Sequence, residues 1–126
     1  MNKLMSDKTT QKIETLRQLI LTTIEDMKGL DVVELDVKGK TSVTDLLIIA
    51  SGTSSRHVKS IAGSVAAQAK KHGCKPLGME GEEQGEWVLV DLGDIIVHVM
   101  QPQVREFYDL EKLWSFEESA EVAAKS

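Results

Sequence analysis

The sequence predicts a single α/β domain of the mixed α+β kind, with about five strands in a mixed sheet and three helices. The spacing of apolar residues predicts the order helix, strand, strand, helix, strand, strand, strand, helix. The stretch after the second strand is helical, and such a crossover allows one parallel strand pair. The length of 126 residues is enough for a core that needs neither disulfides nor metals.

The first half of the chain predicts one helix and two strands. Residues 1–10 are polar and aperiodic, and we expect a flexible N-terminus there. From residue 13, apolar residues recur every three or four positions, as in an amphipathic helix, until Gly29 ends the pattern. Residues 33–37 alternate between apolar and acidic side chains, as in a half-buried strand, whereas residues 45–51 are apolar on both faces, as in a central strand.

The second half predicts a helix, three strands and a last helix. Hydroxyl residues at 51–55 are suited to cap a helix with small apolar residues on one side, which Gly73 ends. An extended piece at 75–79 is followed by a loop at 80–85 and by strands at 86–92 and 94–100, joined tightly at Gly93 and Asp94. Pro102 suits the start of a last helix that runs to about residue 114. We therefore expect a domain at 11–115 and an acidic, disordered tail at 116–126.

Three helices are too few to cover both faces of this sheet. The strands at 45–51 and 94–100 carry apolar side chains on both faces. We therefore expect one face to be left for a partner.

Composition excludes several classes of protein. The 15 basic residues against 20 acidic ones give a net charge of −5, which excludes a polybasic nucleic-acid binder. The longest apolar run, Leu46 to Ala50, is far shorter than the roughly 20 residues of a membrane span. The N-terminus resembles neither a secretory signal nor a transit peptide. The single cysteine, Cys74, favours a reducing compartment.

Two patterns are compatible with phosphate or metal chemistry. Glu34 and Asp36 lie two apart on a strand and could share a divalent cation, although a solvated face is the favoured interpretation because no further ligands are identifiable. The turn from Gly52 to Arg56 could hold phosphate, but it lacks the P-loop spacing and ordinary helix capping is favoured. No acidic residue lies between Arg56 and Lys75, where a nucleotidyltransferase would carry its metal-binding pair.

The histidines do not predict a zinc site or a catalytic base. His57, His72 and His98 are far apart in the sequence. For His98, inside an apolar strand, a local hydrogen bond or an interface is favoured over catalysis.

Charge is distributed unevenly along the chain. Residues 52–73 carry four basic and no acidic side chains, whereas residues 74–101 carry six acidic side chains and one lysine. The acidic part also holds Trp87 and the apolar hairpin, as in a surface for a basic protein. The alternative is that Trp87 is a core residue beside a solvated acidic loop. The last helix is apolar around much of its circumference, so it either contacts two surfaces or is half-wrapped by its own sheet.

Seven short motifs, in order and with compatible spacing, resemble the RsfS or Iojap family of ribosomal silencing factors. The resemblance covers about residues 11–115, and the motifs are LDVKGK at 35–40, TD at 44–45, SGTSSRHV at 51–58, GMEG at 78–81, WVLVDLGD at 87–94, VHVM at 97–100 and YDLEKLW at 108–114.

The resemblance implies a nucleotidyltransferase-like fold without catalytic activity. It implies binding to the large ribosomal subunit through its ribosomal protein number fourteen, which prevents the small subunit from joining and lowers translation when nutrients are scarce. It also implies a homodimer in the free state and a bacterial, cytoplasmic protein. We expect no catalytic or metal-binding residue, no cofactor, and no DNA or membrane partner.

The resemblance assigns partner binding to the strand and turn at 87–94 and to the neighbouring strand. The residues concerned are Trp87, Val90, Asp91, Leu92, Asp94, His98 and Met100. Two alternatives stay open. A divergent nucleotidyltransferase-type enzyme would use Glu34, Asp36 and the turn at Gly52, and an RNA-binding module would use Arg56, Lys59, Lys70 and Lys71.

Overall fold

The computed structural model describes residues 2–42, 44–110 and 112. Its elements follow the predicted order: α1 (Asn2–Asp26), β1 (Leu30–Asp36), β2 (Leu46–Ser51), α2 (Ser55–Lys71), β3 (Gly78–Glu80), β4 (Trp87–Asp91), β5 (Ile95–Met100) and α3 (Pro102–Tyr108). Among the described residues, no helix is both long enough and apolar enough to cross a lipid bilayer.

The strands form one mixed sheet in the order β1-β2-β5-β4-β3. β2 and β5 are parallel, and every other neighbouring pair is antiparallel. The two strands with apolar residues on both faces thus lie in the interior of the sheet, as predicted. The tight hairpin between β4 and β5 is also confirmed: Gly93 adopts a φ of 89°, a conformation that glycine tolerates best.

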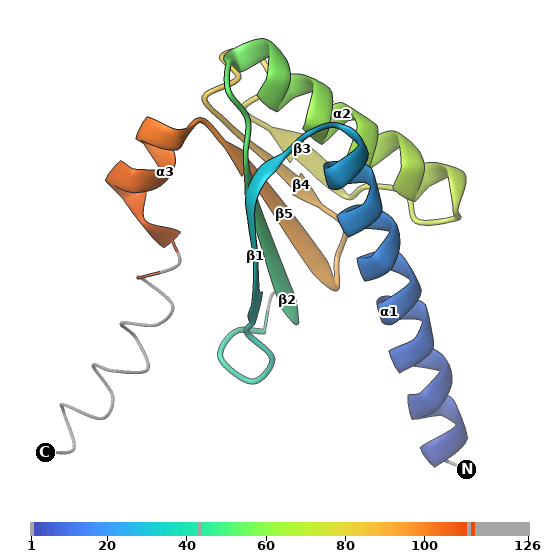
Figure 1. The fold of residues 1–126 in the computed structure, drawn as a ribbon. Coiled ribbons are helices and arrows are strands. Elements are labelled where there is room, and N and C mark those ends of the chain that lie inside the picture. The colour runs from blue at the N-terminus through green and yellow to red at the C-terminus, as the bar shows by residue number, and fades with distance from the viewer. Residues whose placement is uncertain (1, 43, 111, 113–126) are drawn as a thin grey trace, which may run out of the picture.

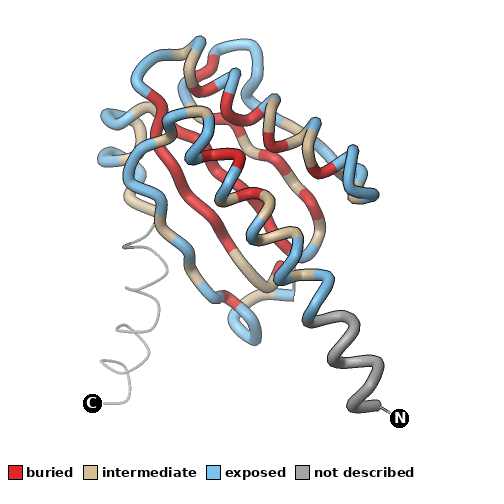
Figure 2. Tube along the Cα trace, turned by 45° about the vertical axis from the view of Figure 1, so that its right-hand side comes forward, coloured by how far each residue is buried: buried red, intermediate tan, exposed pale blue. Residues whose placement is uncertain are grey.

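α1 and α2 pack together on one face of the sheet (Figure 1). Ile20 and Ile24 of α1 and Ile61 of α2 are at most 1% exposed, because they pack against buried sheet residues such as Ile48 and Val97. Buried residues recur along the inner sides of both helices and along the central strands (Figure 2). This core is the one that the apolar spacing predicts.

α3 lies on the other side of the sheet from α1 and α2 (Figure 1). The apolar side chains on this second face are nevertheless covered. Leu47, Ile49, Ile96 and Met100 are at most 8% exposed. Val37, Leu47 and Ile96 form a second cluster, against which Leu35 and Leu89 pack. The expectation of an open apolar face is therefore wrong for the centre of the sheet, where these side chains are buried.

The helix ends differ from the prediction at two places. Residues 2–10, which we expected to be frayed, continue α1 to Asn2, since each added residue of a formed helix gains one hydrogen bond. α3 ends at Tyr108 and does not run on unbroken to residue 114, because Asp109 adopts the left-handed conformation with a φ of 47°. The acidic tail expected at 116–126 lies outside the described residues, and the domain limits 11–115 stay a prediction.

Candidate protein-interaction site

Trp87, the first residue of β4, is the centre of the candidate site. Val88 and Val90 point into the core under the helices, so Trp87 points to the second face, where α3 lies. Its ring centroid lies 5.0 Å from that of Tyr108, and Phe107 meets Tyr108 edge-on at 5.0 Å. Phe107 is 81% exposed and Tyr108 54% exposed. We call Trp87, Phe107 and Tyr108 the aromatic patch, and its exposed apolar area is typical of interaction surfaces.

His98 fixes the orientation of Trp87. The Trp87 Nε1–H donates a hydrogen bond to His98 Nδ1 at 2.9 Å. Because the indole nitrogen can only donate, Nδ1 must be unprotonated and the imidazole must be the neutral Nε2–H form. Burial lowers the pKa of His98 to about 4, so the neutral form prevails at physiological pH.

A tight turn holds carboxylates beside Trp87. Gly81 and Gly85 adopt φ values of 87° and 69°, and the Gly85 N–H donates to the Gly81 carbonyl at 3.0 Å. A Cβ on Gly81 would collide with the carbonyl oxygen of Trp87, so this position requires glycine. Gln101 donates its backbone N–H to Glu86 O at 2.9 Å and its side-chain amide to Gly85 O at 3.1 Å. The turn is thereby fastened to the start of β4 and the end of β5.

A groove of about 390 Å³ opens between this turn, β4 and α3. We call it the aromatic groove, and its lining residues are Glu80, Gly81, Gln84, Glu86, Trp87, Leu89, Val104 and Tyr108. α3 is held against the sheet by Arg105, whose Nη1 donates to Ser51 Oγ at 2.9 Å. The groove therefore combines aromatic rings with two carboxylates.

The structure separates the seven predicted site residues into two sets. Val90 and Leu92 belong to the core under α1 and α2 and are 0% and 5% exposed, so they offer no appreciable surface to a partner. Met100 lies beside Trp87 in the sheet but is 0% exposed. Val90 and Leu92 point toward α1 and α2, whereas Met100 shares the second face with Trp87 and is buried there.

Of the remaining four residues, Trp87, Asp91 and His98 lie on the second face, whereas Asp94 lines a cavity beneath α1. Trp87 and His98 form the hydrogen-bonded pair described above. Asp91 is half-buried and accepts the Gly93 N–H at 2.9 Å, while Asp94 is exposed at the tip of the hairpin. Asp91 follows Trp87 by four residues, about 13 Å along an extended strand. Asp91 and Asp94 thus lie at the opposite end of β4 from Trp87.

Sequence reasoning did not identify Glu80, Val104 and Tyr108 as site residues. Glu80 faces the same side as Trp87 because it pairs with Leu89, and Val104 and Tyr108 lie four apart on α3. The sequence offers one indication of this part of the site: the last helix is apolar around much of its circumference, as in a helix that contacts a second surface. Which strand the helix would meet depends on the tertiary fold.

The residues required by the enzyme alternative do not converge. Asp36 pairs with Leu46 at one end of β2, and Gly52 follows the other end, about 20 Å away. Glu34 is ion-paired with Arg17 of α1 and raises the pKa of that arginine, while Asp36 accepts the Lys38 N–H at 3.0 Å. No group of three potential metal ligands occurs among the described residues.

The turn at Gly52 caps α2. Ser54 Oγ accepts the His57 N–H at 3.1 Å, the Thr53 N–H donates to His57 Nδ1 at 2.9 Å, and the Gly52 N–H donates to Met100 O at 3.0 Å. Three backbone donors of the turn, those of Gly52, Thr53 and His57, are thus already paired within the protein. This arrangement agrees with the favoured capping interpretation.

The basic residues of α2 do not form one stripe. Arg56 and Lys59 lie in its first turns and Lys70 and Lys71 in its last, and Lys59 and Lys70 are about 16 Å apart along the axis. The basic charge is therefore split between the two ends of the helix.

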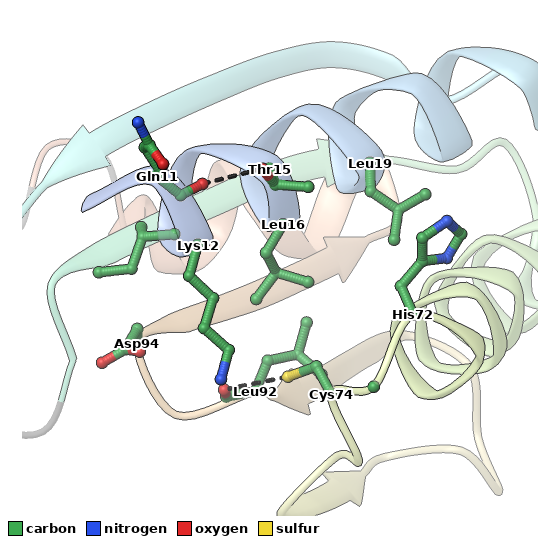
Figure 3. A pocket seen from close by; sticks show the side chains of 11 residues that line it. Gln11, Lys12, Thr15, Leu16, Leu19, His72, Cys74, Leu92 and Asp94 are labelled. Atoms are coloured by element: carbon green, nitrogen blue, oxygen red, sulfur yellow. Dashed lines mark hydrogen bonds between the residues drawn. The ribbon is translucent and has the colours of Figure 1, made fainter. Parts of the chain in front are cut away.

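The other two histidines and the cysteine are engaged with the backbone. His57 Nε2 lies 2.8 Å from Met27 O and links α2 to the end of α1, and His72 Nδ1 lies 3.1 Å from Gln68 O. Cys74 Sγ donates to Leu92 O at 3.7 Å beside a cavity of about 450 Å³. Figure 3 shows Leu16 and Leu19 of α1 pointing toward this cavity. His72 and Cys74 both line this cavity, and each contacts a backbone carbonyl oxygen.

Comparison with known proteins assigns the family. The model of the family "Ribosomal silencing factor during starvation", RsfS, matches residues 10–126. The ribosomal silencing factor RsfS of Chromobacterium violaceum is 48% identical over 103 residues, which span 82% of this chain and 84% of that protein. A mouse protein named "Mitochondrial assembly of ribosomal large subunit protein 1" is 30% identical over 115 residues, 86% of this chain and 50% of that protein.

A solved structure supports the same assignment. A crystal structure of a Chromobacterium violaceum protein has a TM-score of 0.80 and 48% identity, covering 82% of this chain and 86% of that one. The fold and the sequence matches agree over most of the chain, and we conclude that the protein belongs to the RsfS family of ribosomal silencing factors.

Proposed function

We propose that this protein represses translation under nutrient limitation by binding the free large ribosomal subunit through its ribosomal protein number fourteen and sterically preventing the small subunit from joining. Membership of the silencing-factor family supports a role on the ribosome, and the mouse relative is named for assembly of the large subunit. The single observation that carries the proposal is the exposed aromatic patch, whose tryptophan is held in place by His98.

The chemistry of this surface suits a basic protein. Trp87 is half-buried before any partner binds, so its ring is already ordered and little conformational entropy would be lost on binding. Ribosomal proteins are adapted to RNA and are rich in basic side chains. The exposed carboxylate of Asp94 and those beside Trp87 would favour the encounter with such a surface.

Occlusion of this kind is stoichiometric. Each bound copy would block one large subunit, so repression would rise as the concentration of the factor exceeds its dissociation constant. The mechanism requires neither nucleotide nor metal. We further propose that the fold is of the nucleotidyltransferase-like type, that the free protein forms a homodimer and that it acts in the cytoplasm.

Sedimentation of purified subunits through a sucrose gradient tests the proposal. We expect the protein to migrate with the large subunit and to reduce the amount of joined ribosomes when it is added before the small subunit. Addition of the small subunit first should protect the joined ribosomes. Migration with the small subunit, or joining that is unaffected by saturating protein, would contradict the proposal.

A further inference from the structure

We propose that the aromatic groove binds the guanidinium group of an arginine side chain of the protein partner. This inference rests on the proposed function, because it names the chemical group that the same surface would recognise. The groove carries two carboxylates, from Glu80 and Glu86, and two aromatic rings, from Trp87 and Tyr108, around a hollow of about 390 Å³.

The two carboxylates are available to a cation from outside. Glu80 and Glu86 are exposed, and neither forms an ion pair with a described residue of the chain. By contrast, Glu34 on the helix side of the sheet is paired with Arg17. Carboxylates without a local counter-ion beside a hollow favour a cationic ligand and repel phosphate, so the groove suits a basic protein segment and disfavours RNA.

The aromatic rings select arginine over lysine. The ring centroids of Trp87 and Tyr108 are 5.0 Å apart, with their planes at 50°, and both rings line the groove. A planar guanidinium can stack on an aromatic face and donate two hydrogen bonds to a carboxylate at the same time, whereas an ammonium group is compact and strongly hydrated. The Trp87 ring is held by His98 before any ligand arrives.

Titration with a small probe tests the groove without the ribosome. The probe is N-acetylarginine amide, and its controls are N-acetyllysine amide and the uncharged N-acetylcitrulline amide. The Trp87 indole N–H is followed by NMR and is assigned with a Trp87→Phe variant. We expect a saturable shift with the arginine probe, a smaller shift with the lysine probe and none with the citrulline probe.

Paired variants locate the binding. Glu80→Gln combined with Glu86→Gln should abolish the shift, whereas Glu82→Gln combined with Glu83→Gln should preserve it. The second pair makes the same change in net charge within the same turn, but these side chains line a different hollow. Equal shifts with arginine and citrulline probes, or equal losses in the two double variants, would overturn the inference.

Binding to the large subunit separates this inference from the proposed function. If both hold, the Glu80 and Glu86 double variant should bind the subunit at least about tenfold more weakly, while the Glu82 and Glu83 variant changes affinity less than about threefold. If the wild-type protein binds the subunit and the Glu80 and Glu86 double variant binds it equally well, the inference about the groove is wrong and the proposed function still holds. A shift with the arginine probe without any binding to the subunit would support the inference about the groove and contradict the proposed function.

Discussion

The indole N–H of Trp87 donates a hydrogen bond to Nδ1 of His98, 2.9 Å away on the adjacent strand. The two residues are diagonal neighbours, since Trp87 pairs with Met100 and His98 with Leu89. Trp87 packs against Tyr108 of α3 on its other side. The sheet and the helix therefore fix the tryptophan together, and the behaviour of variants at these positions follows from that arrangement.

Replacement of Trp87 by alanine should weaken binding to the large subunit by about 2 kcal/mol or more, because a central aromatic anchor would be lost. Leu77→Ala is the matched control, since Leu77 is 74% exposed outside the aromatic patch and its truncation should leave binding unchanged. Affinities are measured by sedimentation with labelled protein after circular dichroism has shown that both variants fold. Equal binding by wild type and a folded Trp87→Ala protein would remove Trp87 from the site.

Acid should destabilise the protein through His98. The pKa of this imidazole is lowered to about 4 by burial, whereas an unfolded chain titrates near 6.5. Between these values the unfolded chain binds more protons, so the free energy of unfolding falls as the pH drops from 6.5 to 4, by about 3 kcal/mol from this group. Above about pH 7.5 both states are neutral at this position and the contribution is constant.

Urea unfolding of wild type and His98→Gln between pH 4 and 7.5 measures this effect. Glutamine can still accept the Trp87 hydrogen bond through its amide oxygen but does not titrate. Carboxylates elsewhere contribute equally to both proteins, so the difference in slope isolates His98. Identical slopes would mean that the imidazole is not buried in its neutral form.

Gly81→Ala should destabilise the turn beside Trp87. Gly81 has a φ of 87°, where an alanine costs about 1–2 kcal/mol, and the added Cβ would also meet the Trp87 carbonyl. Gly78→Ala is the control, because Gly78 has an ordinary φ and nothing within 4 Å of an added Cβ. Thermal unfolding should show a lower Tm for the first variant and little change for the second. A Tm of Gly81→Ala equal to that of the wild type would contradict this prediction, because it would mean that the turn accommodates the added Cβ.

Binding to the large subunit should weaken as salt rises, because exposed charges are screened. The Asp94 carboxylate is exposed at the hairpin tip, so Asp94→Asn should reduce both the affinity and its dependence on salt. Lys75→Gln removes an exposed positive charge from the same acidic part of the chain, so it should strengthen binding or leave the affinity unchanged. Affinity that is constant between 50 mM and 500 mM potassium chloride would count against an electrostatic contribution.

The order of elements, the central position of β2 and β5 and the core under α1 and α2 follow from the sequence. Apolar residues at helical or strand spacing define which side of each element is buried, and this property is local. The same pattern could not predict where α3 ends, because the left-handed conformation of Asp109 is not encoded by apolar spacing.

The family motifs indicate the strand at 87–94 but not which of its side chains reach the surface. Val90 and Asp91 are neighbours in the sequence, yet Val90 is 0% exposed under the helices while Asp91 lies on the second face. Strand alternation and the packing on both faces decide this difference. The aromatic groove likewise exists only because the fold brings Glu80, Trp87 and Tyr108 together from β3, β4 and α3, and such long-range contacts are determined by tertiary packing.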